Sequence, residues 1–420
     1  MEGLRFRRAR SRRAAASMPG IVGSEEMIVA QCPEAQPALG IADEAVGAPF
    51  RLLWVAAFLG YVGIGATIQV MPAYVEDRFA GSAFAAGLAV TVGFLATMLA
   101  RPIAGRLADG GGPRRIVLAG ALIAAFGGLG HLAAPSLPWL VVARLLLGLG
   151  EGALFTASIG WVLATTPMRS RGSIAGRFGL SMWSGLTIGP ILGAALLGTA
   201  GFQAVWLTAA LLPGFGFMIV SLARPPQRPA SARRTEARAW LPRAAWRPGL
   251  SYLFASIGYG VVASSLVPRF AGLALPGQNI ALAAFGVAFL VTRFAGSPLV
   301  DRFGAAAVLP IALVIQAAGL AGLALVGSET TALAMTVVAG IGIALIYPCY
   351  IALVTDSAEA GERTAALGLV ISAWDLGVAI GGPLGGLLSA RSYAGAFLVA
   401  GLAALVALAI LQARRRSGRG

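Results

Sequence analysis

Lysine is absent from this 420-residue sequence, histidine occurs once, cysteine twice, and only 12% of the residues are charged. His131 alone cannot build a metal site that needs several imidazoles. The presence of a single histidine also excludes most serine or cysteine nucleophile triads, unless His131 itself is the base. Cys32 and Cys349 form neither a disulfide framework nor a zinc-type spacing. With no GxxxxGK[ST] nucleotide loop either, the sequence predicts no enzyme, no metal site and no organic cofactor.

The low content of charged residues indicates which solvent surrounds most of the protein surface. A soluble domain carries about 25% charged residues. This chain has 12%, with 58% hydrophobic residues and a mean hydropathy of +0.81, so we expect lipid around most of it. A bilayer core about 30 Å thick needs roughly 20 apolar residues in a helix. Windows of that length predict an all-α membrane protein with twelve transmembrane helices, at 52–74, 83–104, 116–135, 138–161, 174–197, 204–223, 250–271, 281–300, 306–327, 332–354, 366–389 and 393–413.

The longest break between these windows is rich in proline and arginine, which is typical of a linker. It divides the predicted helices into two sets of six. The expected organisation is a disordered cytoplasmic tail at 1–50, a six-helix bundle at 51–223, a cytoplasmic linker at 224–249, a second six-helix bundle at 250–413 and a tail at 414–420.

Arginine is distributed unevenly between the alternate connections. The two terminal regions, the linker and every second loop hold 25 arginines, whereas the opposite side holds three, Arg78, Arg269 and Arg391. Since positively charged loops stay in the cytoplasm, both termini are predicted to face it, in a multi-pass protein of the cell inner membrane. The net charge of +15 therefore reflects membrane topology and gives no reason to expect nucleic acid as a partner.

The two halves of the sequence resemble each other. Shifting the first half by 192 residues pairs Arg101 with Arg293, Asp109 with Asp301 and several glycines with glycines over about 75 residues. The shift indicates a duplicated six-helix unit. We therefore expect two pseudo-symmetric bundles with a substrate bound between them near the middle of the membrane.

Three motifs resemble the major facilitator superfamily. The stretch "GRLADGGGPRR", from Gly105 to Arg115, is similar to its loop between the second and third helices, although Gly110 and Pro113 replace basic residues. "RLLLGLGEG", from Arg144, is similar to its Arg-x-x-x-Gly-x-Gly motif. The glycine run in 174–197 resembles the superfamily's antiporter motif, with Ala194 in place of the last glycine. The resemblance covers about 51–413 and implies the bacterial drug:proton antiporter or sugar-efflux branch.

Two groups of residues are expected to control conformation. Charges at the repeated loop are predicted to latch one conformation, with simple topology-setting as the alternative: Arg101, Asp109, Arg114, Arg115, Arg293, Asp301 and Arg302. Glycines and prolines are predicted to form a hinge or a seal between the halves, with ordinary close packing as the alternative: Gly176, Gly185, Gly189, Pro190, Gly193, Gly381 and Pro383.

Ionisable groups within apolar helices mark candidate functional sites, because each costs roughly 2.5 to 3.5 kcal/mol to insert. Glu151 and Asp375 are the candidate proton carriers, and Arg144 lies two helical turns from Glu151 on the same face. Structural pairing with an arginine is the alternative for both acids. The predicted helix at 52–74 has no acid, although some antiporters of this family use one there.

The resemblance also implies which helices line the cavity, namely 52–74, 138–161, 250–271 and 332–354. It nominates their polar and aromatic residues for the substrate cavity, with helix packing as the alternative for each: Tyr61, Gln69, Phe155, Thr156, Tyr252, Ser256, Tyr259, Tyr347 and Tyr350. Trp183 and Trp374 occupy similar places in the two repeats.

These features predict a proton-driven exporter of a small molecule that works by alternating access. The proton gradient would be its energy source and a monomer its working form. An uptake symporter for a sugar or organic acid is the alternative, and a membrane sensor or enzyme is a remote one. The sequence does not identify the substrate.

Overall fold

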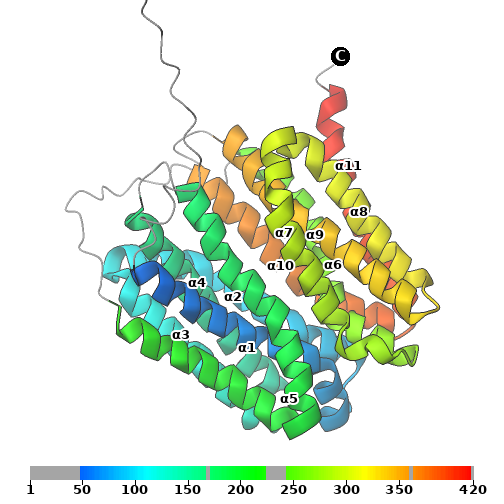
Figure 1. The fold of residues 1–420 in the computed structure, drawn as a ribbon, viewed down its shortest axis with the longest axis horizontal. Coiled ribbons are helices and arrows are strands. Elements are labelled where there is room, and N and C mark those ends of the chain that lie inside the picture. The colour runs from blue at the N-terminus through cyan, green and yellow to red at the C-terminus, as the bar shows by residue number, and fades with distance from the viewer. Residues whose placement is uncertain (1–47, 167–170, 224–242, 359–362, 418–420) are drawn as a thin grey trace, which may run out of the picture. The chain divides into compact units, whose positions relative to one another are not determined.

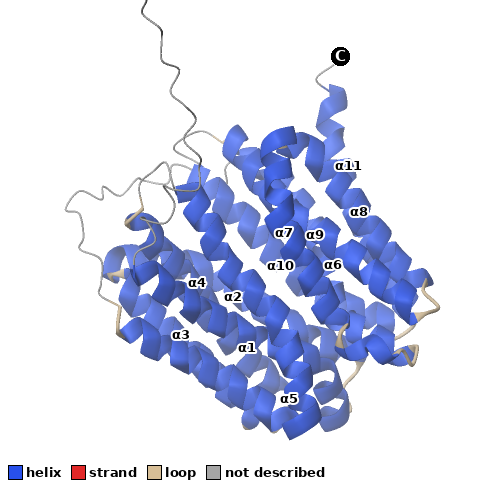
Figure 2. Cartoon of the chain, viewed as in Figure 1, coloured by secondary structure: helices blue, strands red, loops and turns tan. Residues whose placement is uncertain are grey.

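The computed structural model describes residues 48–166, 171–223, 243–358 and 363–417, which belong to one unit, Val46–Gly420. This described part is built of helices and short turns, without a strand (Figure 2). The helices of the first half are α1 (Ala48–Phe79), α2 (Ala83–Gly111), α3 (Pro113–Leu132), α4 (Leu137–Ala164) and α5 (Arg171–Ser221). Those of the second half are α6 (Arg243–Gly272), the short η2 (Pro276–Asn279), α7 (Ala281–Phe303), α8 (Ala305–Leu325), α9 (Glu329–Ser357), α10 (Arg363–Ser389) and α11 (Tyr393–Ser417).

The predicted membrane helices are confirmed, with one difference in how they are joined. Ten of the described helices are long and apolar enough to cross a membrane, and α7 contributes a shorter apolar stretch, Ala281–Gly296. The difference is α5, which contains the predicted spans 174–197 and 204–223 without an intervening loop. Its backbone breaks at Gly201, where φ is 72° and ψ is −173°, so two spans meet at one glycine. The protein is thus a multi-pass membrane protein.

The sequence repeat reappears in the backbone at one turn. Gly112 has φ 94° and ψ 132°, and Gly304, its counterpart 192 residues on, has φ 78° and ψ 146°. The amide of each glycine donates to a carbonyl four residues earlier, Ala108 and Val300. Only glycine adopts such angles readily, which explains why both copies keep it. We call this end of the bundle the Gly112 end, and the opposite end the Gly201 end.

The helix ends correct three predicted boundaries. α6 begins at Arg243, inside the range 224–249 that was predicted as linker, and α1 begins at Ala48 rather than after the predicted tail at 50. α11 continues to Ser417, into the predicted tail at 414–420. The rest of the predicted linker and N-terminal tail, 224–242 and 1–47, lies outside the described residues.

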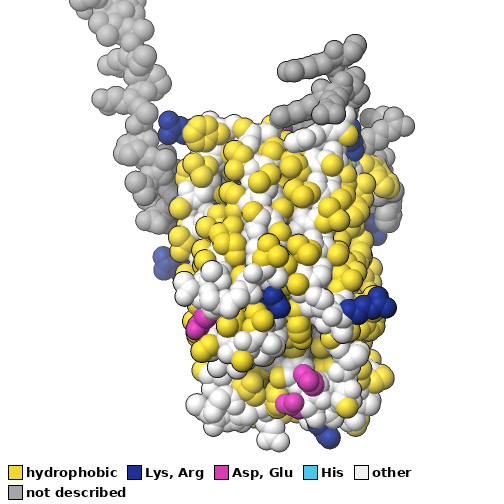
Figure 3. All heavy atoms as spheres, turned by 90° about the vertical axis from the view of Figure 1, so that its right-hand side faces the viewer, with side chains coloured by type: hydrophobic (Ala, Val, Ile, Leu, Met, Phe, Trp, Pro, Cys, Tyr) yellow, Lys and Arg dark blue, Asp and Glu magenta, His cyan; other side chains and the backbone are white. Residues whose placement is uncertain are grey.

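Large hydrophobic side chains cover much of the surface. Phe126 of α3, Met218 of α5 and Leu325 of α8 are examples that are well exposed. Figure 3 shows one face of the molecule, on which hydrophobic side chains are widespread and charged ones are few. In water, an apolar surface of this extent would drive association, whereas acyl chains solvate it.

The helices pack in two sets, α1–α5 and α6–α11, and the most extensive contacts between the sets lie along two lines (Figure 1). One line is α2 against α10, and the other is α5 against α7. Each line carries one threonine whose hydroxyl donates to a carbonyl of the other set. Thr91 bonds to Ala379 at 3.3 Å, and Thr187 bonds to Gly286 at 3.2 Å.

The glycine run of α5 packs against its own half. A Cβ at Gly185, Gly189 or Gly193 would collide with the backbone of α1. In this structure these glycines contact a helix of their own half, and the hinge or seal between the halves stays a prediction. The glycines let α1 and α5 approach closely, as small residues do in membrane helices. Gly176 has open space around it and lines the cavity described below.

The equivalent run of α10 has two glycine faces. A Cβ at Gly381 would strike Ile257 and Gly260 of α6, within the same half. A Cβ at Gly382 would strike Gly87 and Thr91, and one at Gly386 would strike Ala83, all on α2 of the other half. This second face makes a close contact between the halves toward the Gly201 end.

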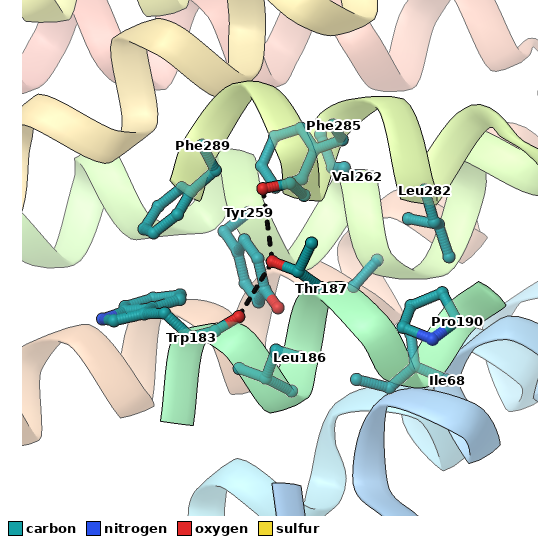
Figure 4. Close-up of a pocket in the computed structure, with 12 residues that line it drawn as sticks. Ile68, Trp183, Leu186, Thr187, Pro190, Tyr259, Val262, Leu282, Phe285 and Phe289 are labelled. Atoms are coloured by element: carbon teal, nitrogen blue, oxygen red, sulfur yellow. Dashed lines mark hydrogen bonds between the residues drawn. The ribbon is translucent and has the colours of Figure 1, made fainter. Parts of the chain in front are cut away.

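The first repeat lacks this second face. Pro190 and Ala194 occupy the positions equivalent to Gly382 and Gly386. Near Pro190 a void of about 20 Å³, room for roughly one water, remains between α1, α5, α6 and α7 (Figure 4). Thr187 closes one side of it with the bonds drawn to Trp183 and Gly286. The α2–α10 contact is consequently the more closely packed of the two.

Candidate functional site: a central cavity

A cavity of about 1580 Å³ lies between the two sets of helices. Described residues of eight helices line it: α1, α2, α4, α5, α6, α7, α9 and α10. Its lining includes Arg106, Leu163 and Asp356 at the Gly112 end, of which Arg106 and Asp356 are exposed. At its inner end, Trp183, Leu186 and Tyr259 line both the cavity and the small void behind them (Figure 4). The cavity therefore opens at the Gly112 end and is closed toward the Gly201 end.

An ion pair crosses the cavity wall between the halves. Nε of Arg101, on α2, lies 2.8 Å from Oδ2 of Asp375, on α10. Asp375 is only 2% exposed and Arg101 16%. A buried carboxylate keeps its charge when a counter-charge and a hydrogen bond compensate the lost hydration. The pair satisfies the predicted alternative for Asp375, pairing with an arginine, and gives Arg101 a contact with the other half.

Arg144, in the first third of α4, is held by three hydrogen bonds. Its guanidinium donates to the carbonyls of Ala89 and Val90 on α2, at 2.8 and 2.6 Å, and to the hydroxyl of Thr67 on α1, at 2.5 Å. The side chain is 2% exposed. Most of its donors are therefore committed to fastening α4 to α1 and α2.

Glu151 is buried without a described partner. It is fully inaccessible, and neither carboxylate oxygen has a hydrogen-bond partner among the described residues. The carboxyl group lies against α1 at Gly60, where an added Cβ would overlap it. Glu151 is not among the described residues that line the cavity, although Phe155, one turn away, is. Burial of a carboxyl group without a hydrogen-bond partner is costly, which marks Glu151 as a candidate functional residue.

Five of the nine nominated cavity residues line the cavity: Tyr61, Phe155, Thr156, Tyr259 and Tyr347. The other four, Gln69, Tyr252, Ser256 and Tyr350, are not in its described lining, because helix contacts cover them. All four are buried. The Tyr252 ring stacks on Tyr350 at 4.4 Å between centroids, and the Tyr350 hydroxyl bonds to Ser251 at 2.6 Å.

The residues predicted to form the latch at the repeated loop have different contacts. Arg114 donates to the carbonyls of Ser221 and Ala223 and so caps the end of α5 within its own half. Arg293 lies over the ring of Tyr347, 4.5 Å from its centroid, and Arg302 over that of Phe303. Arg115 is exposed, and the side chains of Asp109 and Asp301 lie outside the described ones.

The sequence reasoning missed the contribution of four helices to the cavity: α2, α5, α7 and α10. Phe94, Thr97 and Arg101 on α2 line it at helical spacings of three and four residues. That spacing of polar and aromatic residues, ending at an intramembrane arginine, was a signal in the sequence. Trp183 and Trp374 were noted for their similar places in the two repeats, and their rings meet edge to face at 5.9 Å.

Comparison with known proteins decides the family. The model of the Major Facilitator Superfamily matches residues 53–274 and 249–419. The chain belongs to the major facilitator superfamily. Its members are transporters and not enzymes. The chain is 30% identical to the uncharacterized MFS-type transporter STM4428 of Salmonella typhimurium, over 85% of this chain and 94% of that protein. It is 31% identical to the uncharacterized MFS-type transporter YhhS of Escherichia coli, over 84% and 89%.

Solved structures show the same major facilitator fold at low sequence identity. A bacterial homologue of the human lysosomal transporter Spinster, in an inward-facing and unoccupied conformation, matches with a TM-score of 0.73 and 16% identity, over 88% of this chain and 96% of that one. The nucleoside transporter NupG matches with a TM-score of 0.71 and 12% identity, over 87% and 99%. These similarities establish the fold and leave the substrate open.

Proposed function

We propose that this superfamily member is a proton-coupled transporter of a small molecule, and that Asp375 carries the coupling proton. The observation that supports this proposal is the Arg101–Asp375 pair, which joins α2 to α10 beside the cavity. Protonation of Asp375 removes the charge that holds Arg101, so proton binding changes both the contact between the halves and the charge of the cavity. Glu151 is a second proton site in this proposal.

The open end of the cavity faces the cytoplasm in this proposal, since the arginine-rich connections lie at the Gly112 end. The structure then represents an inward-open state of an inner-membrane protein with cytoplasmic termini. Separation of α2 from α10 at the Gly201 end, with closure at the Gly112 end, would give the outward-open state.

Export in exchange for protons is the direction that the glycine run of α5 favours, through its similarity to the antiporter motif. Uptake together with protons is the second candidate, and the Arg101–Asp375 pair favours it for one kind of substrate. If an anion takes the place of Asp375 beside Arg101, a proton on Asp375 and an anion on Arg101 strengthen each other's binding.

Reconstituted liposomes with an imposed pH gradient and an internal pH dye test this proposal. Candidate sugars, organic acids and cationic drugs are added outside in turn. Exchange makes protons move opposite to the compound, whereas co-transport makes them move with it. Asp375→Asn should abolish proton movement, and Asp356→Asn, at the exposed mouth of the cavity, should not. Proton movement that survives in Asp375→Asn would reject Asp375 as the carrier.

A further inference from the structure

The two lines of contact between the halves differ at one equivalent position. The 192-residue shift pairs Trp183 of α5 with Asp375 of α10, and it also pairs their neighbours Gly185 and Gly377. Asp375 makes an ion pair with Arg101 across the α2–α10 contact. At the corresponding place of the α5–α7 contact, Trp183 makes an aromatic contact instead.

The Trp183 ring belongs to the first half but packs against three rings of the second half. Its centroid lies 4.3 Å from that of Phe289 on α7, 5.9 Å from that of Trp374 on α10 and 6.2 Å from that of Tyr259 on α6. None of these four side chains is more than 7% exposed. Rings buried this completely against one another leave little surface for a ligand and instead hold the two halves together.

This ring cluster lies at the closed end of the cavity. Trp183 and Tyr259 line the cavity on one side and the small void on the other (Figure 4). Thr187, one turn further along α5, donates to the Gly286 carbonyl of α7. The α5–α7 contact lacks the glycine face that brings α10 onto α2, so side chains close this side of the cavity.

The ring cluster has to come apart before the cavity can open at the Gly201 end. Trp183 moves with the first half and its three ring partners move with the second, so α5 and α7 cannot separate there while the cluster is intact. Buried aromatic side chains of this kind dominate the energetics of a contact between two bodies. Loss of the Trp183 ring should therefore favour opening of this end.

We propose that Trp183 is a gate residue for the Gly201 end. Its ring closes the α5–α7 side of the cavity in this structure, and it leaves Phe289, Tyr259 and Trp374 when that end opens. The equivalent position of the second half holds the charged Asp375, so one contact between the halves depends on an ion pair and the other on apolar rings. This inference rests on the alternating access of the proposed function, but not on Asp375 as the proton carrier.

Cysteine labelling from each side of the membrane tests the inference. A single cysteine replaces Ser372 in the cavity, with Cys32 and Cys349 replaced by serine. A membrane-impermeant thiol reagent is added to intact cells and to inverted vesicles, and the side from which this parent protein labels more slowly is that of the closed Gly201 end. Trp183→Ala should speed labelling from that side about tenfold or more, because three aromatic contacts are lost. Trp183→Phe, which keeps a smaller ring, should give an intermediate rate.

The matched control is Trp206→Ala, on the same helix. Trp206 is also buried, but its ring contacts are with Tyr74, Phe202 and His131 of its own half. This variant should lower the melting temperature without speeding labelling from the Gly201 side. Where an alanine variant does not fold, the phenylalanine variants of the two positions are compared instead.

Two results would overturn the inference. One is labelling of the Trp183 variants from the Gly201 side at the rate of the parent protein. The other is equally fast labelling of the Trp206 variants, which would indicate general loosening of the fold. Loss of proton movement in Asp375→Asn would in either case still support the proposed function.

Discussion

A carboxylate as deeply buried as that of Asp375 keeps its charge only beside a counter-charge, and Arg101 supplies one from the other half of the molecule. This pairing could not be read from the sequence, because 274 residues separate the two partners. The sequence did single out both residues, since each is an ionisable group within an apolar run.

Loss of Arg101 should destabilise the protein more than loss of the whole pair. Arg101→Gln leaves the Asp375 carboxylate buried without compensation, which we expect to cost about 3 to 5 kcal/mol. The double variant Arg101→Gln/Asp375→Asn keeps two neutral hydrogen-bonding groups and should recover most of that loss. The free energy of unfolding of the single and the double variant is measured in detergent at neutral pH. Additive losses in the double variant would show that the pair does not stabilise the fold.

Glu151 should tolerate loss of its ionisable group without loss of folding. Because neither oxygen has a described partner, Glu151→Gln should change the free energy of unfolding by less than about 1 kcal/mol. If Glu151 loads and releases protons, the same variant should lose transport driven by a pH gradient but keep substrate exchange at equal pH. Flux measurements under the two conditions distinguish these effects. Wild-type flux under both conditions would show that Glu151 does not carry the proton.

At the scale of helices, α10 shows what a spacing pattern can and cannot predict. The run of glycines in its sequence correctly indicated close helix contacts. The pattern did not reveal that Gly381 faces α6 while Gly382 faces α2 of the other half. Adjacent residues point about 100° apart around a helix, so the identity of each neighbour depends on tertiary packing.

The α2–α10 contact should control opening at the Gly201 end. A methyl group at Gly382 overlaps Gly87 and Thr91, and overpacking of this kind costs about 1 to 3 kcal/mol. Gly382→Ala should therefore favour separation of α2 and α10 about fivefold or more. The readout is a single cysteine at the cavity position Ser372, with Cys32 and Cys349 replaced by serine. In Gly382→Ala, a thiol reagent added outside intact cells should label this cysteine faster than in the protein without that substitution.

The matched control for this variant is Gly198→Ala on α5, where an added Cβ meets nothing within 4 Å. This control should label like the wild type. Slower or unchanged labelling of Gly382→Ala would mean that the α2–α10 contact does not close the outer end.

The turn at Gly112 should be sensitive to any side chain. Its φ of 94° lies in a region that other residues avoid, so Gly112→Ala should cost about 1 to 3 kcal/mol of stability. Gly304→Ala should behave alike, since it is the repeat equivalent with the same backbone. Gly214→Ala, in a helix with open space around it, is the control. Equal melting temperatures for the three variants would contradict this account.

For the whole molecule, composition and the repeat predicted an all-α membrane protein of two duplicated halves, and the resemblance of the motifs supplied the major facilitator fold. The shortage of charge indicated lipid, windows of 20 apolar residues located the helices, and the 192-residue shift indicated the duplication. The cavity was predicted less well. Tyr61 and Tyr347 line it, whereas Gln69 and Tyr350 are covered by neighbouring helices. Which face of a helix meets a cavity depends on crossing angles and partners that a linear pattern does not contain.

Distances between spin labels at the two ends test most directly whether the halves alternate in exposing the cavity. One pair of labels replaces Leu107 and Phe303 at the Gly112 end, and the other replaces Leu132 and Leu325 at the Gly201 end, all of them exposed. Double electron–electron resonance in nanodiscs measures the distance within each pair of labels. The distances are compared between acidic and alkaline pH, and between the wild type and Asp375→Asn. The account predicts that the two distances change in opposite directions, one lengthening as the other shortens. Distances that stay fixed, or that change in the same direction at both ends, would contradict it.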